Sequence, residues 1–190
     1  QSHPFPERWL EEKVALYEQG DGALWEGAVL SYAKETAAYC CGLLEAGLEA
    51  AAQDVKLEEN FGPVFTEDRR QLSALMEACA AGDWDKALAL RQAFAPSRRK
   101  PLRGYKEDPL FCRLDACRKE VAKALEPLEK CLCGTRGENC RELQEAAPLL
   151  KSLQALTLDF SRRYREKKRE RDFLDYSDLE HCAIEQFCGP

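Results

Sequence analysis

The 190-residue sequence lacks several patterns, and each absence excludes a class of protein. No run of residues approaches the roughly 18 consecutive apolar side chains that a membrane-spanning helix needs. The first residues, Gln1 to Pro4, lack the basic stretch followed by an apolar stretch that marks a secretion signal. No segment of strand length alternates apolar and polar residues, and β-branched residues are few. We therefore predict an all-α protein that does not enter a membrane.

Catalytic motifs are also missing. There is no G-x-x-x-x-G-K-[ST] segment to cradle nucleotide phosphates, and no paired acidic motif after a buried strand to hold Mg²⁺. With only two histidines, His3 and His181, no Ser–His–Asp or Cys–His set is credible, and His181 is read as a surface or interface residue. Asp175 and Asp178 could form a catalytic pair, but helix capping explains them more simply. We predict that the chain itself catalyses no reaction and holds no cofactor.

Cysteine, in contrast, is abundant, with ten residues at positions 40, 41, 79, 112, 117, 131, 133, 140, 182 and 188. Most lie within helical patterns beside Ala and Leu, as small buried residues do. Only Cys131, Cys133 and Cys140 are close enough in sequence to share a metal, and no fourth ligand follows at zinc-ribbon spacing. Free thiols in a reducing cytoplasm are the favoured interpretation, and a metal at these three stays open.

The net charge is −6, but the cations gather in two places. The first basic cluster is Arg98, Arg99, Lys100, Arg103 and Lys106, with no acid between them. The second basic cluster contains Arg162, Arg163, Arg165, Lys167, Lys168, Arg169 and Arg171, offset by Glu166 and Glu170. An acidic body with two basic clusters could contact a phosphate backbone locally. The candidate DNA contacts are Arg98, Arg99, Lys100, Arg103, Lys106, Arg163, Lys167, Lys168 and Arg171.

Apolar residues at helical spacing predict helices over about 6–17, 23–54, 66–81, 83–94, 108–126 and 139–171. The 23–54 helix is expected to be the longest, with Trp25, Tyr32 and Tyr39 on its buried stripe. Breaks are predicted at Asn60–Pro63 and Pro127, with an interruption at Pro148. Residues 95–106, here called the strap, are predicted to be irregular because of two prolines and a glycine.

Two further features of the helices concern their packing. Gly42 and Gly47, inside the 23–54 helix, are expected to allow a bend or the close approach of a neighbouring helix. The 139–171 helix is expected to bury a stripe of Leu149, Leu150, Leu153, Leu156, Phe160 and Tyr164. These patterns predict long amphipathic helices in a bundle-like arm, with shorter helices packed around them.

The segment 164–185 is predicted to be a junction. The basic end of a long helix leads into the turn Phe173-Leu174-Asp175-Tyr176. A capping box of Ser177-Asp178-Leu179-Glu180 then starts another helix. We expect 1–172 to form the helical arm and 173–190 to form the turn and the start of the next helix. A helix that begins so near Pro190, and a first residue that is not Met, suggest a piece of a longer protein.

Two sequence segments carry a family resemblance. Tyr164-x-x-x-Lys168 followed by Leu174-Asp175-Tyr176-Ser177-Asp178-Leu179-Glu180-His181 resembles the Y-x-x-x-K…L-D-F-x-D-L-E-H segment of UvrD-like superfamily 1 helicases. Here Tyr176 replaces the usual Phe, and the Glu-His ending points to the AddA component of the AddAB-type ATP-dependent helicase/nucleases. The opening His3-Pro4-x-Pro6-Glu7-x-Trp9-Leu10 is similar to that family's S-x-P-x-P-E-x-W-L stretch.

The resemblance implies a position and a context. The matching region in this family is subdomain 1B, a helical insertion in the first RecA-like motor domain. The parent protein would then be a bacterial cytoplasmic enzyme that uses ATP and Mg²⁺ to unwind DNA. It would also carry a distant nuclease domain, pair with AddB as its second helicase/nuclease subunit, and act in double-strand break repair and recombination.

Two hypotheses follow for the chain itself. In the first, it is a non-catalytic arm that contacts the phosphate backbone of duplex DNA. In the second, it is a structural spacer or subunit-docking domain with no direct DNA contact. Both basic clusters on one exposed face would favour the first hypothesis, and clusters that are each neutralised by adjacent acids would favour the second.

Overall fold

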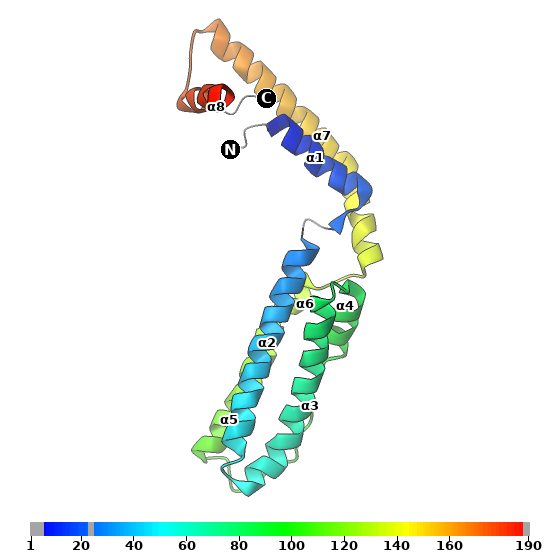
Figure 1. Cartoon of the computed structure of the whole chain (residues 1–190), viewed down its shortest axis with the longest axis vertical. Helices are drawn as coiled ribbons and strands as arrows, with labels where there is room; N and C mark the ends of the chain where they lie inside the picture. The colour runs from blue at the N-terminus through cyan, green and yellow to red at the C-terminus, as the bar shows by residue number, and fades with distance from the viewer. Residues whose placement is uncertain (1–5, 23–24, 188–190) are drawn as a thin grey trace. The chain divides into compact units, whose positions relative to one another are not determined.

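The computed structural model describes residues 6–22 and 25–187 (Figure 1). The end motif residues His3 and Pro4, Cys188, and the side chains of Pro6, Ser177, His181 and Glu185 lie outside this description. The helices are α1 (Pro6–Gln19), α2 (Glu26–Ala51), α3 (Val55–Ala80), α4 (Trp84–Ala93), α5 (Pro109–Leu125), α6 (Leu128–Cys131), α7 (Arg136–Glu170) and α8 (Tyr176–Phe187). No strand occurs in the described ranges, and the all-α prediction is confirmed.

The chain forms two structural units. The central unit is residues 23–137 and contains α2 to α6. The terminal unit joins residues 1–22 to residues 138–190 and contains α1, most of α7, and α8. The predicted boundary at residue 172 concerns a different division, between the arm and the helix that follows it, and it stays a prediction.

The core of the central unit lies between α2, α3, α4 and α5 (Figure 1). α2 contributes a stripe of mostly small residues at steps of three and four: Leu30, Ala33, Ala37, Cys40, Leu44 and Gly47. The stripe that the sequence predicted is shifted by one residue from this buried stripe. Its tyrosines were predicted to be buried, and this was wrong, since Tyr32 is 45% exposed and Tyr39 is 52% exposed. Small side chains allow two helix backbones to approach, and the neighbouring helices therefore cover this stripe rather than the tyrosines.

Gly47 marks the closest approach of this kind. A Cβ atom placed on Gly47 would lie 2.5 Å from Cε2 of Phe65 on α3, whose side chain is fully buried. Gly42, five residues earlier on the same helix, has no such neighbour within 4 Å. The prediction of close helix approach is therefore confirmed at Gly47.

α3 runs through the segment that was predicted to break it. Asp54 caps this helix by accepting from the backbone N–H groups of Lys56 (2.8 Å) and Leu57 (3.1 Å). Pro63 lies inside the helix, where its missing N–H is destabilising by about 3 kcal/mol or more. Phe61 and Phe65 flank it and are fully buried, which stabilises by roughly 1.5–3 kcal/mol for each ring. Core burial thus offsets the proline, and Thr66 is an exposed residue within the helix rather than its cap.

The other predicted helix ends in this unit follow the local signals. Gly82 adopts a left-handed φ of 71° between α3 and α4. Asp83 accepts from the N–H of Lys86 at 3.1 Å, and Asp108 accepts from the N–H of Phe111 at 2.9 Å. Pro127 separates α5 from α6, as predicted. Each of these signals acts within one helical turn, so the sequence alone is sufficient to locate it.

In the terminal unit, α7 has 35 residues and is the longest helix of the described chain. The expectation that 23–54 would be longest was wrong, as was the interruption at Pro148. α1 lies alongside α7 (Figure 1), with Glu18 bonded to Lys151 at 2.8 Å and Glu7 bonded to Arg165 at 3.0 Å. The side of α7 that faces α1 thus carries two exposed ion pairs, and it also includes the buried Ala147 and the half-buried Leu158.

The predicted apolar stripe of α7 lies on the opposite face. Lys151 and Arg165 are fourteen positions apart and share the side of the helix that faces α1. The apolar stripe is half a turn away from them. Its members Leu149, Leu153, Leu156, Phe160 and Tyr164 are between 47% and 74% exposed. The prediction that they are buried was therefore wrong for these five residues, whereas Leu150, the sixth member of the predicted stripe, is half-buried.

Candidate nucleic-acid interface

The strap, residues 95–106, is irregular as predicted, and its backbone is fixed at several points. The N–H of Ser97 donates to Oδ1 of Asp68 at 2.8 Å, and Asp68 is only 2% exposed. The carbonyl of Ser97 accepts from Nη2 of Arg118 at 2.6 Å. Further along, Nδ2 of Asn60 donates to the carbonyl of Lys100 at 2.8 Å. Because buried and partly buried side chains bind its backbone on both sides of Arg98, the strap is an ordered element.

Arg99 provides a further attachment. Its guanidinium group lies 5.2 Å from the ring centroid of Phe61 and 4.8 Å from that of Phe111, within the range of a cation–π contact. Nη2 of Arg99 also lies 3.4 Å from Oδ1 of Asp115. With only 21% of its side chain exposed, Arg99 holds the strap against α3 and α5.

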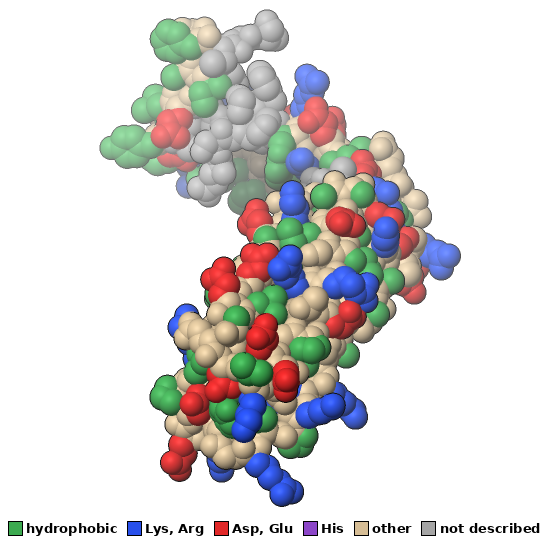
Figure 2. Space-filling model, turned by 60° about the horizontal axis from the view of Figure 1, so that its bottom comes forward, with side chains coloured by type: hydrophobic (Ala, Val, Ile, Leu, Met, Phe, Trp, Pro, Cys, Tyr) green, Lys and Arg blue, Asp and Glu red, His purple; other side chains and the backbone are tan. Residues whose placement is uncertain are grey.

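The other four members of the first basic cluster differ from Arg99. Arg98, Lys100, Arg103 and Lys106 are exposed, and none of them forms an ion pair within the described part of the chain. Figure 2 shows Lys and Arg side chains interspersed with Asp and Glu over the face it presents. Four neighbouring cations without acid partners are therefore a specific feature of the strap.

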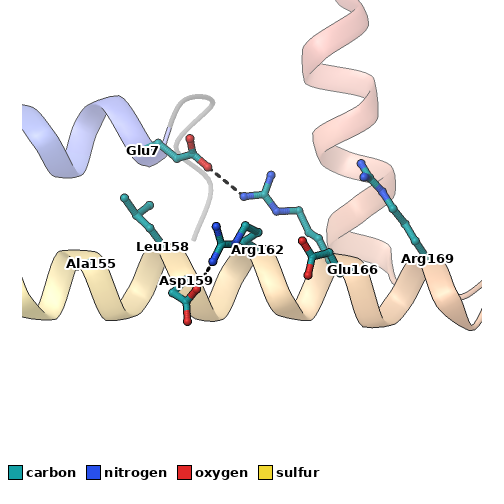
Figure 3. Close-up of a pocket in the computed structure, with 8 residues that line it drawn as sticks. Glu7, Ala155, Leu158, Asp159, Arg162, Glu166 and Arg169 are labelled. Carbon is teal, nitrogen blue, oxygen red and sulfur yellow. Dashed lines mark hydrogen bonds and ion pairs between the residues drawn. The ribbon is translucent and has the colours of Figure 1, made fainter.

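The second basic cluster is mostly paired. Arg162 and Arg163 both bind Asp159, Arg165 binds Glu7, and Lys167 binds Glu170. Figure 3 shows a pocket on this part of the terminal unit, lined by three acids (Glu7, Asp159 and Glu166) and three arginines (Arg162, Arg165 and Arg169). Arg169 and Arg171 form no ion pair among the residues described. Acids thus neutralise most of this cluster.

Lys168 belongs to a separate network at the junction with α8. Its Nζ lies 2.6 Å from Asp178 and 3.1 Å from Asp175, and 4.6 Å from the ring centroid of Tyr164. The hydrogen bond from Lys168 is the main cause that lowers the pKa of Asp178, and the same bond raises the pKa of Lys168. Lys168 therefore joins three other family-motif residues, Tyr164, Asp175 and Asp178.

The two aspartates cap α8 reciprocally. Oδ1 of Asp175 accepts from the N–H of Asp178 at 3.0 Å, and Oδ2 of Asp178 accepts from the N–H of Asp175 at 2.9 Å. The predicted capping box at Ser177–Glu180 was thus two positions too late, because α8 already begins at Tyr176. The interpretation of the two acids as capping residues fits this geometry. Leu174, Tyr176, Leu179 and Glu180 of the motif are exposed.

Cysteine chemistry adds no site in the described ranges. Cys131 and Cys140 are free thiols, and no group of three or more His, Cys, Asp or Glu residues in the described chain could hold a metal ion. Burial raises the pKa of Cys40 to about 11, which keeps this thiol protonated at neutral pH.

The described helices include none that is long and apolar enough to cross a membrane.

Sequence reasoning missed the residues that support the strap. Asp68, Arg118 and Asn60 bind its backbone, and Lys119 lies beside it on α5. No local sequence pattern marks these residues. Asp68, Arg118 and Asn60 bind strap residues that are at least 21 positions away in sequence, and Lys119 lines a groove between the strap and α5. The nine candidate DNA contacts stay predictions, and their surroundings now divide them into unpaired, paired and packed residues.

These features define an all-α protein with an ordered basic strap and an exposed apolar helix face. No family model matches the chain. Its sequence is similar to the AddA component of the ATP-dependent helicase/nuclease from Ruminiclostridium cellulolyticum, with 30% identity over 208 aligned residues that cover 97% of this chain and 15% of the relative. The same-named protein of Desulforudis audaxviator is 28% identical over 202 residues, which cover all of this chain and 16% of the relative.

A third protein of this name, from Bacillus licheniformis, is 29% identical over 189 residues, which cover 96% of this chain and 15% of the relative. The resemblance predicted from the two end motifs is therefore confirmed. Along almost its whole length, the chain is similar to one segment of the AddA component of ATP-dependent helicase/nucleases. It spans about 15% of the length of these curated relatives.

Proposed function

We propose that this chain is the helical region, in the position of subdomain 1B, of an ATP-dependent DNA helicase/nuclease subunit, and that its strap contacts the phosphate backbone of duplex DNA. The observation that carries the proposal is the set of four exposed cations on the strap, Arg98, Lys100, Arg103 and Lys106, which form no ion pair in the described chain. A DNA phosphate would supply the missing anionic partners.

The order of the strap supports this proposal energetically. Ordering an irregular loop costs conformational entropy, about 1–2 kcal/mol for each residue. Contacts from Asp68, Arg118, Asn60 and Arg99 already fix this backbone in the absence of DNA. The gain from phosphate contacts is then available for binding, because little of it is spent on ordering the loop.

The longer protein would supply the chemistry. The relatives' names describe an ATP-dependent helicase and nuclease. Under this proposal ATP, Mg²⁺ and the nuclease centre belong to other regions of the polypeptide. Pairing with AddB, a role in double-strand break repair and a cytoplasmic location belong to the same proposal.

The salt dependence of duplex binding tests the strap. Fluorescence anisotropy with a labelled duplex, measured from about 50 to about 200 mM salt, gives the slope of log K against log[salt]. Four phosphate contacts predict a slope of about −3.6, at about −0.9 for each contact. Replacing Arg98, Lys100, Arg103 and Lys106 by Gln removes these contacts and brings the slope close to zero.

A matched control removes the same charge elsewhere. Replacing Arg162, Arg163, Arg165 and Lys167 by Gln also removes four positive charges, but those residues are paired with acids. We expect this variant to keep most of the slope. Equal losses in both variants would show that net charge alone drives binding, and an unchanged slope in the strap variant would exclude the strap from the DNA path.

A second candidate function, a structural or docking role, is favoured by the exposed apolar face of α7. Leu153, Leu156 and Phe160 are large, exposed and turned away from α1. Its occupant would be another region of a longer polypeptide, since the curated relatives are several times the length of this chain. In the full-length protein, Leu153→Gln with Leu156→Gln should then lower thermal stability while duplex affinity is retained. Unchanged stability would argue against the docking role.

A further inference from the structure

A groove runs between the strap and α5 in the central unit. Its cationic lining is Arg98, Arg99 and Lys106 from the strap with Arg118 and Lys119 from α5, and Asp115 is its one acid. The volume of the groove is about 880 Å³. It is therefore large enough for a small anionic group and open enough for that group to belong to a longer molecule.

The cations of the groove have different roles. Arg118 binds the carbonyl of Ser97, and Arg99 lies between two phenylalanine rings, so both hold the strap in place. Asp115 is shared by Arg99 at 3.4 Å and Lys119 at 3.0 Å. These two cations, with the hydrogen bond from Lys119 as the main cause, lower the pKa of Asp115 and keep it ionised.

Three cations remain available to a ligand. Arg98 and Lys106 have no ion-pair partner in the described chain, and the side chain of Lys119 is 80% exposed despite its contact with Asp115. A Lys ammonium has three N–H donors, so Lys119 can bind a phosphate oxygen while it keeps Asp115. Pro96, Pro101, Leu102 and Phe111 form apolar parts of the same groove. Apolar walls lower the local dielectric constant and strengthen charge–charge attraction.

We propose that this groove seats phosphates of a DNA backbone, with Arg98, Lys106 and Lys119 each binding one of them. The proposal rests on the proposed function and extends it, because Lys119 comes from α5 and lies outside the basic run of the strap. Arg98 would bind two phosphate oxygens with its planar fork, and the two lysines would act as point charges. The apolar wall would face the sugar.

The test is the single-charge variant Lys119→Gln in the 190-residue chain. Loss of one phosphate contact should weaken duplex binding and reduce the magnitude of the salt slope by about 1. Lys106→Gln, on the other side of the groove, should reduce it equally. The control is Arg113→Gln, an exposed cation on the same helix that does not line the groove, and it should leave the slope unchanged. Circular dichroism melting verifies that each variant is folded.

A second arm uses inorganic phosphate as the probe and amide NMR shifts as the readout. Shifts confined to Ser97–Lys100 and Arg118–Lys119 that also arise on duplex addition support the groove. Shifts with inorganic phosphate but without any duplex binding would overturn the assignment to a nucleic-acid backbone. If the four-residue strap variant loses its slope while Lys119→Gln matches Arg113→Gln, the groove is refuted and the proposed function stands. Absence of duplex binding by the unmodified chain would refute both.

Discussion

Replacing Gly47 by Ala tests how closely α2 and α3 pack. The added Cβ atom would lie 2.5 Å from Cε2 of Phe65, a distance that real Cβ atoms essentially never show, and 3.0 Å from Cδ2, which is also tight. Phe65 is fully buried, and its ring packs against Phe61 with centroids 5.5 Å apart. The ring therefore has little room to move, and we expect α2 and α3 to be pushed apart.

The magnitude follows from two opposing effects. Ala is favoured over Gly inside a helix by about 1 kcal/mol. Extra atoms in a well-packed core cost typically about 1–3 kcal/mol. The net effect of Gly47→Ala should therefore be a loss of roughly 0–2 kcal/mol. A Cβ atom at Gly42 on the same helix would meet nothing within 4 Å, so Gly42→Ala should only raise the free energy of unfolding through the higher helix preference of Ala. The difference between the two variants isolates the clash, at about 1–3 kcal/mol.

Equilibrium urea unfolding followed by tryptophan fluorescence measures this difference. The chain has three tryptophans, and Trp9 lies in the terminal unit. In a Trp9→Phe background the remaining two, Trp25 and Trp84, report on the central unit, where their rings are in edge contact at 5.0 Å. Equal stabilisation by Gly47→Ala and Gly42→Ala would refute the close packing at Gly47.

Three further predictions concern local contacts. Asp83→Ala removes the cap of α4 and should lower the free energy of unfolding by about 1 kcal/mol in the same urea experiment. Lys168→Gln should raise the pKa of Asp178 in a carboxyl NMR titration, because Lys168 is the main cause of its low value. Since the folded-state pKa of Asp178 is depressed, its stabilisation is complete above the unfolded-state value of about 3.9 and is lost as the pH falls through the folded-state value. The third prediction concerns thiol reactivity, counted in the native protein at about pH 8. Cys112→Ser should remove one reactive thiol, because Cys112 is exposed. Cys40→Ser should remove none, because burial raises the pKa of Cys40 to about 11.

Tertiary contacts overrode a local signal at Pro63. The local sequence at Asn60–Pro63 predicts a break in the helix. The rings of Phe61 and Phe65, on either side of Pro63, are buried in the core and keep α3 continuous. At Pro148 the helix also continues. The position of a helix break depends on whether burial of the flanking residues exceeds the cost of the proline, and the sequence does not state how deeply those residues are buried.

Apolar periodicity likewise identified helices without identifying their partners. In α2 the tyrosine stripe and the small-residue stripe are adjacent, and α3 packs on the smaller one, leaving Tyr32 and Tyr39 exposed. In α7 the apolar stripe is regular, but α1 lies on the opposite face, where Glu7 and Glu18 form ion pairs with Arg165 and Lys151. A helical pattern shows which residues share a face, and only the arrangement of helices shows what covers that face.

The sequence by itself determined the all-α class, the helix ends at Gly82, Asp83, Asp108 and Pro127, and the resemblance to the AddA component of ATP-dependent helicase/nucleases. These features depend on residues within one turn of each other or on short motifs. Only the tertiary structure decided which cations are free. Arg99 lies between Phe61 and Phe111 while Arg98 is exposed, although the two are neighbours in one basic run. The physical reason is that ion pairs and ring contacts join residues far apart in sequence, so charge is visible in a sequence and its neutralisation is not.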